Sequence, residues 1–230
     1  MFSFNRLREL AHRPVGHHLD TLSWYYHRVE YFAFTRKYSL EFDGFVPRDE
    51  LVTEYRESVA DSHNYRPYTN FHVKRLLQEA LSTGMRFDNF VDVGCGKGLP
   101  CIFAKKYFHF ENVFGIDFSE PLIDIAKRNA LKTPYKNMHF LVADATTWCL
   151  PSGNSLVLLN SPFNEVILEK FLNTNLEHFD RYRSLIAYGN DHHLSTLCRL
   201  GFEVIYRSNR LEQSILSRGC NVPRRNWIAG

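Results

Sequence analysis

The sequence predicts an α/β fold, with a mostly parallel seven-stranded sheet, helices on both faces and an N-terminal helical extension. From residue 90 onward, short apolar runs with strand character alternate with longer runs whose apolar residues recur at helical spacing. Such alternation is typical of βαβ units, which place helices on both faces of a parallel sheet. A glycine-rich turn follows the first strand, and an aromatic-rich stretch precedes the whole pattern.

Two domains are predicted: an N-terminal helical, aromatic-rich cap at residues 1–60 and a main domain at residues 61–230. In the cap, residues 19–34 read as a helix with more apolar bulk than one face needs. In the main domain, a helix begins at Thr69 or Asn70 and stops before Gly84.

The alternating pattern then gives each element in turn. Strands are predicted at residues 90–93, 113–117, 138–142, 155–159, 184–188, 202–206 and 213–217. Helices are predicted at residues 99–108, 121–131, 165–178 and 191–200. Gly201 fits a helix stop immediately before a strand.

The turn after the first strand carries Gly94, Gly96 and Gly98. Glycine allows a positive φ and a close approach to a ligand, and the following helix N-terminus offers N–H donors with a partial positive charge. The last glycine of the dinucleotide pattern GxGxxG is missing, which disfavours a pyrophosphate ligand. Asp92, two residues ahead of the turn, suits a ligand with an ammonium group. This combination resembles motif I of the class I S-adenosylmethionine-dependent methyltransferases.

Two further acids follow predicted strands. Asp117 ends the second strand, where a carboxylate of a Rossmann-like site accepts both ribose hydroxyls. Asp144 and Ala145 follow the third strand and resemble the third motif of the family, whose Asp accepts from the adenine amino group. For both acids the alternative is a helix cap or a turn, although Ser119 suits the cap role better than Asp117. Phe118 packs either beside the adenine or in the core.

The resemblance implies the Rossmann-like class I methyltransferase fold, with the strand at 213–217 as an antiparallel hairpin partner. It implies S-adenosyl-L-methionine as cofactor, with Asp92 acting on the ammonium side of its methionine moiety. Residues 63–71 also resemble an element that precedes motif I in a broad set of largely uncharacterised bacterial methyltransferases. There, Tyr65 and Thr69 are predicted to close over the methionine end; a helix-capping turn with packed tyrosines is the alternative.

The loop Asn160-Ser161-Pro162-Phe163 is the main clue to the methyl acceptor. It resembles the Asn-Pro-Pro-Phe/Tyr motif of methyltransferases that act on planar amino groups, and an Asn-Pro-Phe variant in the bacterial set. By resemblance, Asn160 and the Ser161 carbonyl accept the two amino hydrogens and Phe163 stacks on the substrate. The alternative is an Asx-type turn before Pro162. In the Asn-Pro-Phe alignment, Ser161 would take the place of the Asn.

Three residues near this loop are candidate proton acceptors. Glu165 follows it directly, and His192 and His193 follow the fifth strand. A first-turn helical Glu and surface histidines are the simpler interpretations. No metal site is expected, because the histidines and cysteines lack recognisable ligand spacing.

The bulk composition sets limits on location and partners. A net charge of +3 does not demand a nucleic-acid partner, and no apolar run of transmembrane length indicates a membrane. Five scattered cysteines suit reduced thiols in the cytoplasm. Arginines gather in residues 207–225, which either bind an anionic surface or form a solvated C-terminus.

The preferred activity is N-methylation of a planar amino or amide nitrogen, on a protein side chain or a nucleobase. One alternative is methylation of a small metabolite at oxygen or nitrogen, with residues 1–60 closing a pocket. Another is a non-catalytic binding protein that retains the cofactor fold. The identity of the acceptor and the oligomeric state are left open by the sequence.

Overall fold

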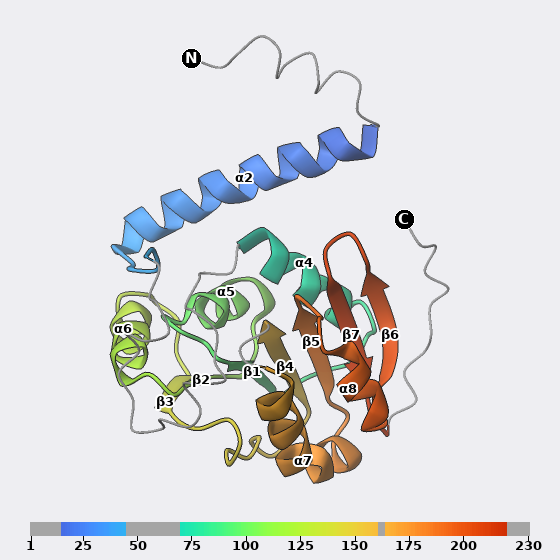
Figure 1. Cartoon of the computed structure of the whole chain (residues 1–230). Coiled ribbons are helices and arrows are strands. Elements are labelled where there is room, and N and C mark those ends of the chain that lie inside the picture. The colour runs from blue at the N-terminus through green and yellow to red at the C-terminus, as the bar shows by residue number, and fades with distance from the viewer. Residues whose placement is uncertain (1–14, 45–69, 161–163, 220–230) are drawn as a thin grey trace.

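The computed structural model describes residues 15–44, 70–160 and 164–219. Seven strands form one sheet in the order β3-β2-β1-β4-β5-β7-β6 (Figure 1). Strands β1 to β5 run parallel, and β7 is antiparallel to both β5 and β6. The strands are β1 (Asn89–Val93), β2 (Asn112–Asp117), β3 (Met138–Val142), β4 (Ser155–Asn160), β5 (Leu185–Gly189), β6 (Glu203–Ser208) and β7 (Gln213–Ser217). The Rossmann-like α/β fold and the antiparallel hairpin of β6 and β7 are confirmed.

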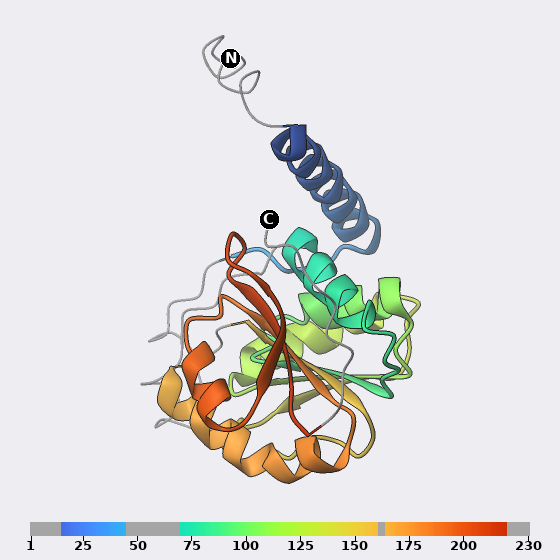
Figure 2. The same cartoon turned by 90° about the vertical axis from the view of Figure 1, so that its right-hand side faces the viewer.

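Helices cover both faces of the sheet (Figure 2). One face carries α4 (Asn70–Leu81), α5 (Leu99–Phe108) and α6 (Glu120–Leu131), and the other carries α7 (Glu165–Arg181) and α8 (Leu194–Arg199). Successive strand residues point to opposite faces, so Phe90 and Leu156 enter the first core while Val91 and Val157 enter the second. Central strands buried on both faces explain why their sequences are continuous apolar runs.

Helix ends follow local chemistry, with one correction. Gly84 adopts a φ of 77° and its N–H donates to the Leu81 carbonyl at 3.0 Å, so it ends α4 as predicted. Ser119 occupies the N-cap position of α6, but its hydroxyl makes no capping hydrogen bond. Instead, the carboxylate of Asp117, the last residue of β2, accepts a hydrogen bond from the Ser119 N–H at 2.9 Å. The expectation that the Ser119 side chain caps this helix was therefore wrong.

The last helices differ from their predicted lengths. α7 continues to Arg181, beyond the predicted end at 178. α8 is shorter than predicted and spans only Leu194–Arg199, because the residues before it form a loop anchored on Asp191. Asp191 is almost fully buried at 3% exposure, and its side chain pairs with Arg207 of β6. A tertiary ion pair thus replaces the predicted first helical turn.

The N-terminal helix α2 (Val15–Tyr38) packs outside the α4 and α5 layer, and its N-terminal end extends away from the sheet (Figures 1 and 2). Its C-terminal part is anchored by Phe34, whose ring lies 5.3 Å from that of Phe103 in α5. By contrast, Tyr26 and Val29 are 64% and 67% exposed. Residues 39–44, called the strap below, follow α2 without regular secondary structure.

The proposed boundary between residues 60 and 61 lies outside the described residues and stays a prediction. None of the helices in the described ranges has the length and apolar character needed to cross a bilayer.

The glycine turn offers a test of close packing. A Cβ at Gly98 would lie 2.8 Å from Phe140 Cε1 and 3.0 Å from Ala126 Cβ, at a φ of +82°. Gly84 has a similar φ of +77°, yet nothing lies within 4 Å of its added Cβ. We expect Gly98→Ala to lower the free energy of unfolding by ~1–3 kcal/mol more than Gly84→Ala, because overpacking adds to backbone strain. Urea unfolding of both variants measures this; equal losses would contradict it.

Candidate functional site

The carboxyl ends of β1 to β5 meet at one edge of the sheet. Val93, at the end of β1, pairs with Ile116 of β2 on one side and with Leu159 of β4 on the other. The chain leaves β1 toward β2 in one direction and later returns to β4 in the other, so the strand order reverses beside β1. Open α/β sheets bind their ligands at such a reversal.

Four of the predicted site residues lie at this edge. Asp92 lies near the end of β1, Asp117 ends β2, and Asn160 ends β4. Asp144 comes two residues after β3. The sequence-based placement of these residues at or near the carboxyl ends of the strands is therefore confirmed, while their roles remain predictions.

The glycine turn joins β1 to α5. Gly94, Gly96 and Gly98 have φ values of 77°, 51° and 82°, which are left-handed conformations that favour glycine. The turn is fixed to β2, because the N–H groups of Gly94 and Cys95 both donate to the Ile116 carbonyl at 2.9 Å. Gly94 is exposed, whereas the rest of the turn is buried. The turn therefore presents its backbone to solvent at its first residue, beside the strand ends.

Asp117 connects this turn to the start of α6. One carboxylate oxygen accepts from the Gly96 N–H at 2.9 Å, and the other accepts from the Ser119 N–H at 2.9 Å. Burial raises the pKa of Asp117 to about 6, although hydrogen bonds from the backbone N–H groups of Ser119, Gly96 and Phe118 oppose the shift. An ionised carboxylate oxygen accepts more than one hydrogen bond, so each oxygen retains capacity for a ribose hydroxyl.

Asp92 faces α5 from within β1. It is 2% exposed, and the Cys101 thiol donates to its carboxyl at 3.8 Å. Burial raises the pKa of Asp92 to about 8, with a further rise from the negative charge of Asp117 and a smaller opposing effect of the Cys101 hydrogen bond. Asp92 is therefore mostly neutral near pH 7. Its predicted action on an ammonium group requires that group or an intervening water to lower this pKa.

Asp144 forms a turn after β3. One of its carboxylate oxygens accepts from the Thr146 N–H at 2.8 Å, and its carbonyl accepts from the Trp148 N–H at 3.0 Å. The turn interpretation is thus present in the structure, and these hydrogen bonds hold the Asp144 side chain near the end of β3. Ala145 and Phe118 are both half-buried at this edge. Their contacts with a cofactor stay predictions.

Asn160 is paired with a residue that the sequence analysis did not select. The side-chain amide of Asn190 donates to the Asn160 side-chain oxygen at 2.9 Å. Asn190 directly follows β5 and has a φ of 51°. The sequence did hold a signal for this residue: an asparagine, which tolerates a positive φ, stands at the end of a predicted parallel strand. The pair places two amides at the ends of neighbouring strands.

Five predicted site residues lie outside the described residues, namely Ser161, Pro162, Phe163, Tyr65 and Thr69. Their predicted roles in stacking, acceptor recognition and closure over the cofactor stay predictions.

The candidate proton acceptors occupy less suitable positions. His192 is exposed, and His193 is half-buried with its backbone N–H donating to the Tyr188 hydroxyl at 3.3 Å. Glu165 begins α7, accepts from the Thr196 hydroxyl and lies 3.6 Å from Arg199. The Thr196 hydrogen bond and the Arg199 charge lower the pKa of Glu165. Glu165 is therefore a poor general base, and its structural interpretation is favoured.

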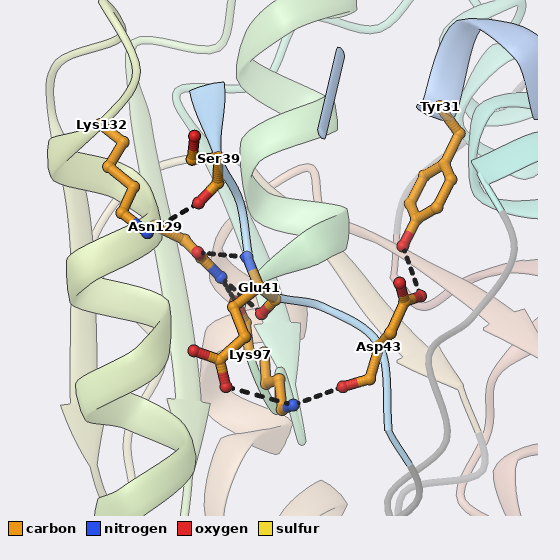
Figure 3. Close-up of polar contacts among 7 residues, drawn as sticks. All are labelled: Tyr31, Ser39, Glu41, Asp43, Lys97, Asn129 and Lys132. Carbon is orange, nitrogen blue, oxygen red and sulfur yellow. Dashed lines mark hydrogen bonds and ion pairs between the residues drawn. The ribbon is translucent and has the colours of Figure 1, made fainter. Parts of the chain in front are cut away.

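The strap lies against the glycine turn, which the sequence did not reveal (Figure 3). Lys97, within the turn, donates from Nζ to the Asp43 carbonyl at 2.6 Å and lies 3.7 Å from a Glu41 carboxylate oxygen. Asn129 of α6 contacts both the strap and the turn through its side-chain amide. The available signals were a lysine between two glycines and an asparagine at helical spacing from the buried Ala126.

Comparison with known proteins fits this geometry. Residues 90–180 match a protein family described as a methyltransferase domain. The chain is 34% identical over 84 residues to the ribosomal protein L11 methyltransferase of Thermotoga neapolitana, which covers 36% of this chain and 30% of that protein. It is 45% identical over 56 residues to the tRNA (guanine-N(7)-)-methyltransferase of Pediococcus pentosaceus. This match covers 24% of this chain and 26% of that protein. The chain thus matches under a third of each relative's length.

Solved structures show the same kind of similarity. A ribosomal protein L11 methylase from Lactobacillus delbrueckii matches with a TM-score of 0.47 and 17% identity, over 66% of this chain and 80% of that one. TrmN from Thermus thermophilus matches with a TM-score of 0.49 and 20% identity, over 66% of this chain and 49% of that one.

Residues 90–180 are therefore similar to a methyltransferase domain, in agreement with the resemblance of the motifs to the class I S-adenosylmethionine-dependent type. S-adenosyl-L-methionine is the cofactor of this class. The residues present fit it: the exposed Gly94 lies at the strand edge, and Asp117 lies at the end of β2. In addition, the Ser119 hydroxyl is buried and has no hydrogen-bond partner within the described ranges. A buried polar group without a partner is typical of a site that a ligand completes.

The buried Asp92 makes stability depend on pH. Its pKa is about 8 in the folded protein and ~4 in an unfolded chain, so folding takes up a proton between these values. The free energy of unfolding should then fall as pH rises through this window, by at most ~1.4 kcal/mol per pH unit for this group.

We expect Asp92→Asn to lack this decline, because an amide does not titrate. The free energy of unfolding of Asp92→Asn, relative to that of the wild type, should therefore rise between about pH 5.5 and about pH 7.5. Both pH values lie between the unfolded-state pKa of ~4 and the folded-state pKa of ~8. Urea unfolding of both proteins across the range measures the difference. Parallel stability curves would show that the Asp92 carboxyl is not held neutral.

Proposed function

We propose that this protein is an S-adenosylmethionine-dependent methyltransferase that N-methylates a planar amino or amide nitrogen. The observation that carries the proposal is the glycine turn with three positive φ angles, joined through Gly96 to Asp117 at the reversal of strand order. The match of residues 90–180 to a methyltransferase family supports it.

In this proposal, residues at the ends of different strands bind different parts of the cofactor. Asp117 accepts from the ribose hydroxyls, and Asp144 accepts from the adenine amino group with Ala145 and Phe118 beside it. Gly94 and Gly96 allow the methionine moiety to approach the backbone. Asp92 acts on the ammonium group, directly or through water.

When bound, S-adenosyl-L-methionine supplies an electrophilic methyl group for in-line displacement. The protein then has to align the acceptor nitrogen and remove its proton, which requires neither a metal nor a covalent nucleophile. The residues at the strand ends provide alignment.

Asn160 is the residue that we assign to the acceptor. Asn190 donates to its side-chain oxygen and thereby fixes the orientation of the amide. A carbonyl oxygen has two lone pairs, so one remains for a hydrogen of the substrate amino group. Holding that hydrogen would direct the nitrogen lone pair toward the methyl group.

The acceptor is proposed to be a macromolecule, a protein side chain or a nucleobase, in the cytoplasm. The two relatives in the comparison are named for a ribosomal protein and for tRNA, both of which are macromolecules.

The ribose assignment is tested by Asp117→Asn. We expect affinity for S-adenosylhomocysteine to fall by ~1–3 kcal/mol, because charge-assisted hydrogen bonds are lost. The matched control is Asp88→Asn, which removes a carboxylate that accepts from the Asn154 N–H at 2.8 Å at the opposite edge of the sheet. Calorimetry measures both. Wild-type affinity in Asp117→Asn would overturn the assignment, and no binding by the wild type would overturn the enzymatic proposal.

The acceptor assignment is tested by transfer of a radiolabelled methyl group into a host lysate, fractionated into protein, RNA, DNA and small molecules. We expect label in protein or nucleic acid. Asn160→Ala should slow transfer ~10- to 100-fold by misaligning the acceptor, with cofactor affinity little changed. Label confined to small molecules would favour metabolite methylation, and undiminished transfer by Asn160→Ala would remove Asn160 from the acceptor site.

A further inference from the structure

We propose that Lys97 and Asn129 are positioning residues that couple the strap to the glycine turn, so that cofactor binding and strap docking stabilise each other. The proposal rests on the cofactor site proposed above. It assigns the N-terminal region a role in shaping that site, through contacts between segments far apart in the chain.

Asn129 joins three segments at one side chain. It is fully buried at 0% exposure on α6. Its amide oxygen accepts from the Glu41 N–H at 2.9 Å, and its amide nitrogen donates to the Glu41 carbonyl at 2.9 Å and to the Lys97 carbonyl at 3.2 Å. A buried amide that loses its partners is costly, so the strap and the turn stabilise this arrangement together.

Lys97 makes the connection electrostatic as well. It is 6% exposed, although it belongs to the turn that borders the cofactor edge. Its ammonium donates to the Asp43 carbonyl and lies 3.7 Å from the Glu41 carboxylate. A buried ammonium requires acceptors, and both of these come from the strap. Release of the strap would thus remove acceptors from a charged group inside the turn.

The strap is in turn fixed to its surroundings along its length (Figure 3). The Lys132 ammonium donates to the Ser39 carbonyl at 2.7 Å, and the Tyr31 hydroxyl of α2 donates to the Asp43 carboxylate at 3.2 Å. Phe42 is 1% exposed and packs in the cluster that contains Phe103 of α5. The docked strap therefore links α2, α5 and α6 to the glycine turn.

Coupling follows from these shared groups. The turn conformation that the strap contacts is the one in which Gly94 is exposed beside the strand ends and the Gly96 N–H donates to Asp117. A ligand that binds this conformation also favours the docked strap, and by thermodynamic reciprocity the docked strap raises ligand affinity by the same factor.

The test combines calorimetry with hydrogen–deuterium exchange on the full chain, using S-adenosylhomocysteine as the probe. The variants are Lys97→Met and Asn129→Leu. Lys105→Met is the matched lysine control, because Lys105 donates to the carbonyls of Phe110 and Glu111, a loop before β2. The matched asparagine control is Asn89→Leu: Asn89 is 3% exposed at the start of β1, and its side-chain amide donates to the Ser152 carbonyl and the Ser155 hydroxyl, away from the carboxyl ends of the strands.

In the wild type, the probe should slow amide exchange in the strap at least ~10-fold, including at the Glu41 N–H. Lys97→Met and Asn129→Leu should bind the probe at least ~10-fold more weakly and should exchange strap amides faster even without it. The controls should keep wild-type affinity within ~2-fold, even where they lower stability equally.

Two results would overturn the coupling alone. The first is that the bound probe leaves the amide exchange rate of the strap in the wild type unchanged. The second is that the variants release the strap and still bind the probe with wild-type affinity. Variants that keep the strap docked would show that Lys97 and Asn129 do not position it. If the wild type fails to bind the probe, both the coupling and the proposed function are wrong.

Discussion

The hydrogen bonds of the Asp117 carboxylate hold the functional edge of this protein together. One oxygen fixes the glycine turn through the Gly96 N–H, and the other fixes the start of α6 through the Ser119 N–H. Burial of the carboxylate is unfavourable, as its raised pKa of about 6 shows, and these backbone donors offset part of that cost. Because α6 carries Asn129, the position of the strap also depends on this carboxylate.

The electrostatics of the same edge would favour a cationic ligand. Asp92 and Asp117 are both buried, and the charge of Asp117 contributes to the raised pKa of Asp92. Two carboxyl groups in a medium of low polarity resist simultaneous ionisation. A bound cation would relieve that resistance. The proposed cofactor carries both a sulfonium and an ammonium group, so its charge is matched to the edge that the strands create.

The acceptor side is organised by amides. The pair formed by Asn160 and Asn190 is set by the parallel pairing of β4 with β5, which brings the residues after the two strands together. Nearby, the ion pair between buried Asp191 and exposed Arg207 orders the loop that carries His192 and His193. The two histidines are therefore placed by a structural ion pair, and the oriented amide of Asn160 is the better-defined feature for recognising a substrate.

The sequence by itself determined most of the helices and strands and the edge of the sheet at which the strand-end polar residues lie. Apolar periodicity, three glycines and a polar residue at or near the end of each of the first four strands are local signals. The placement of Asp117 and Asn160 follows from the common direction of parallel strands. Only the tertiary structure decided which groups meet across long separations. Lys97 and Asp43 are 54 residues apart, and Asn129 and Glu41 are 88 apart. The raised pKa of Asp92 likewise could not be predicted from the sequence, because a pKa depends on burial and on neighbouring charges, which are set only once the chain has folded.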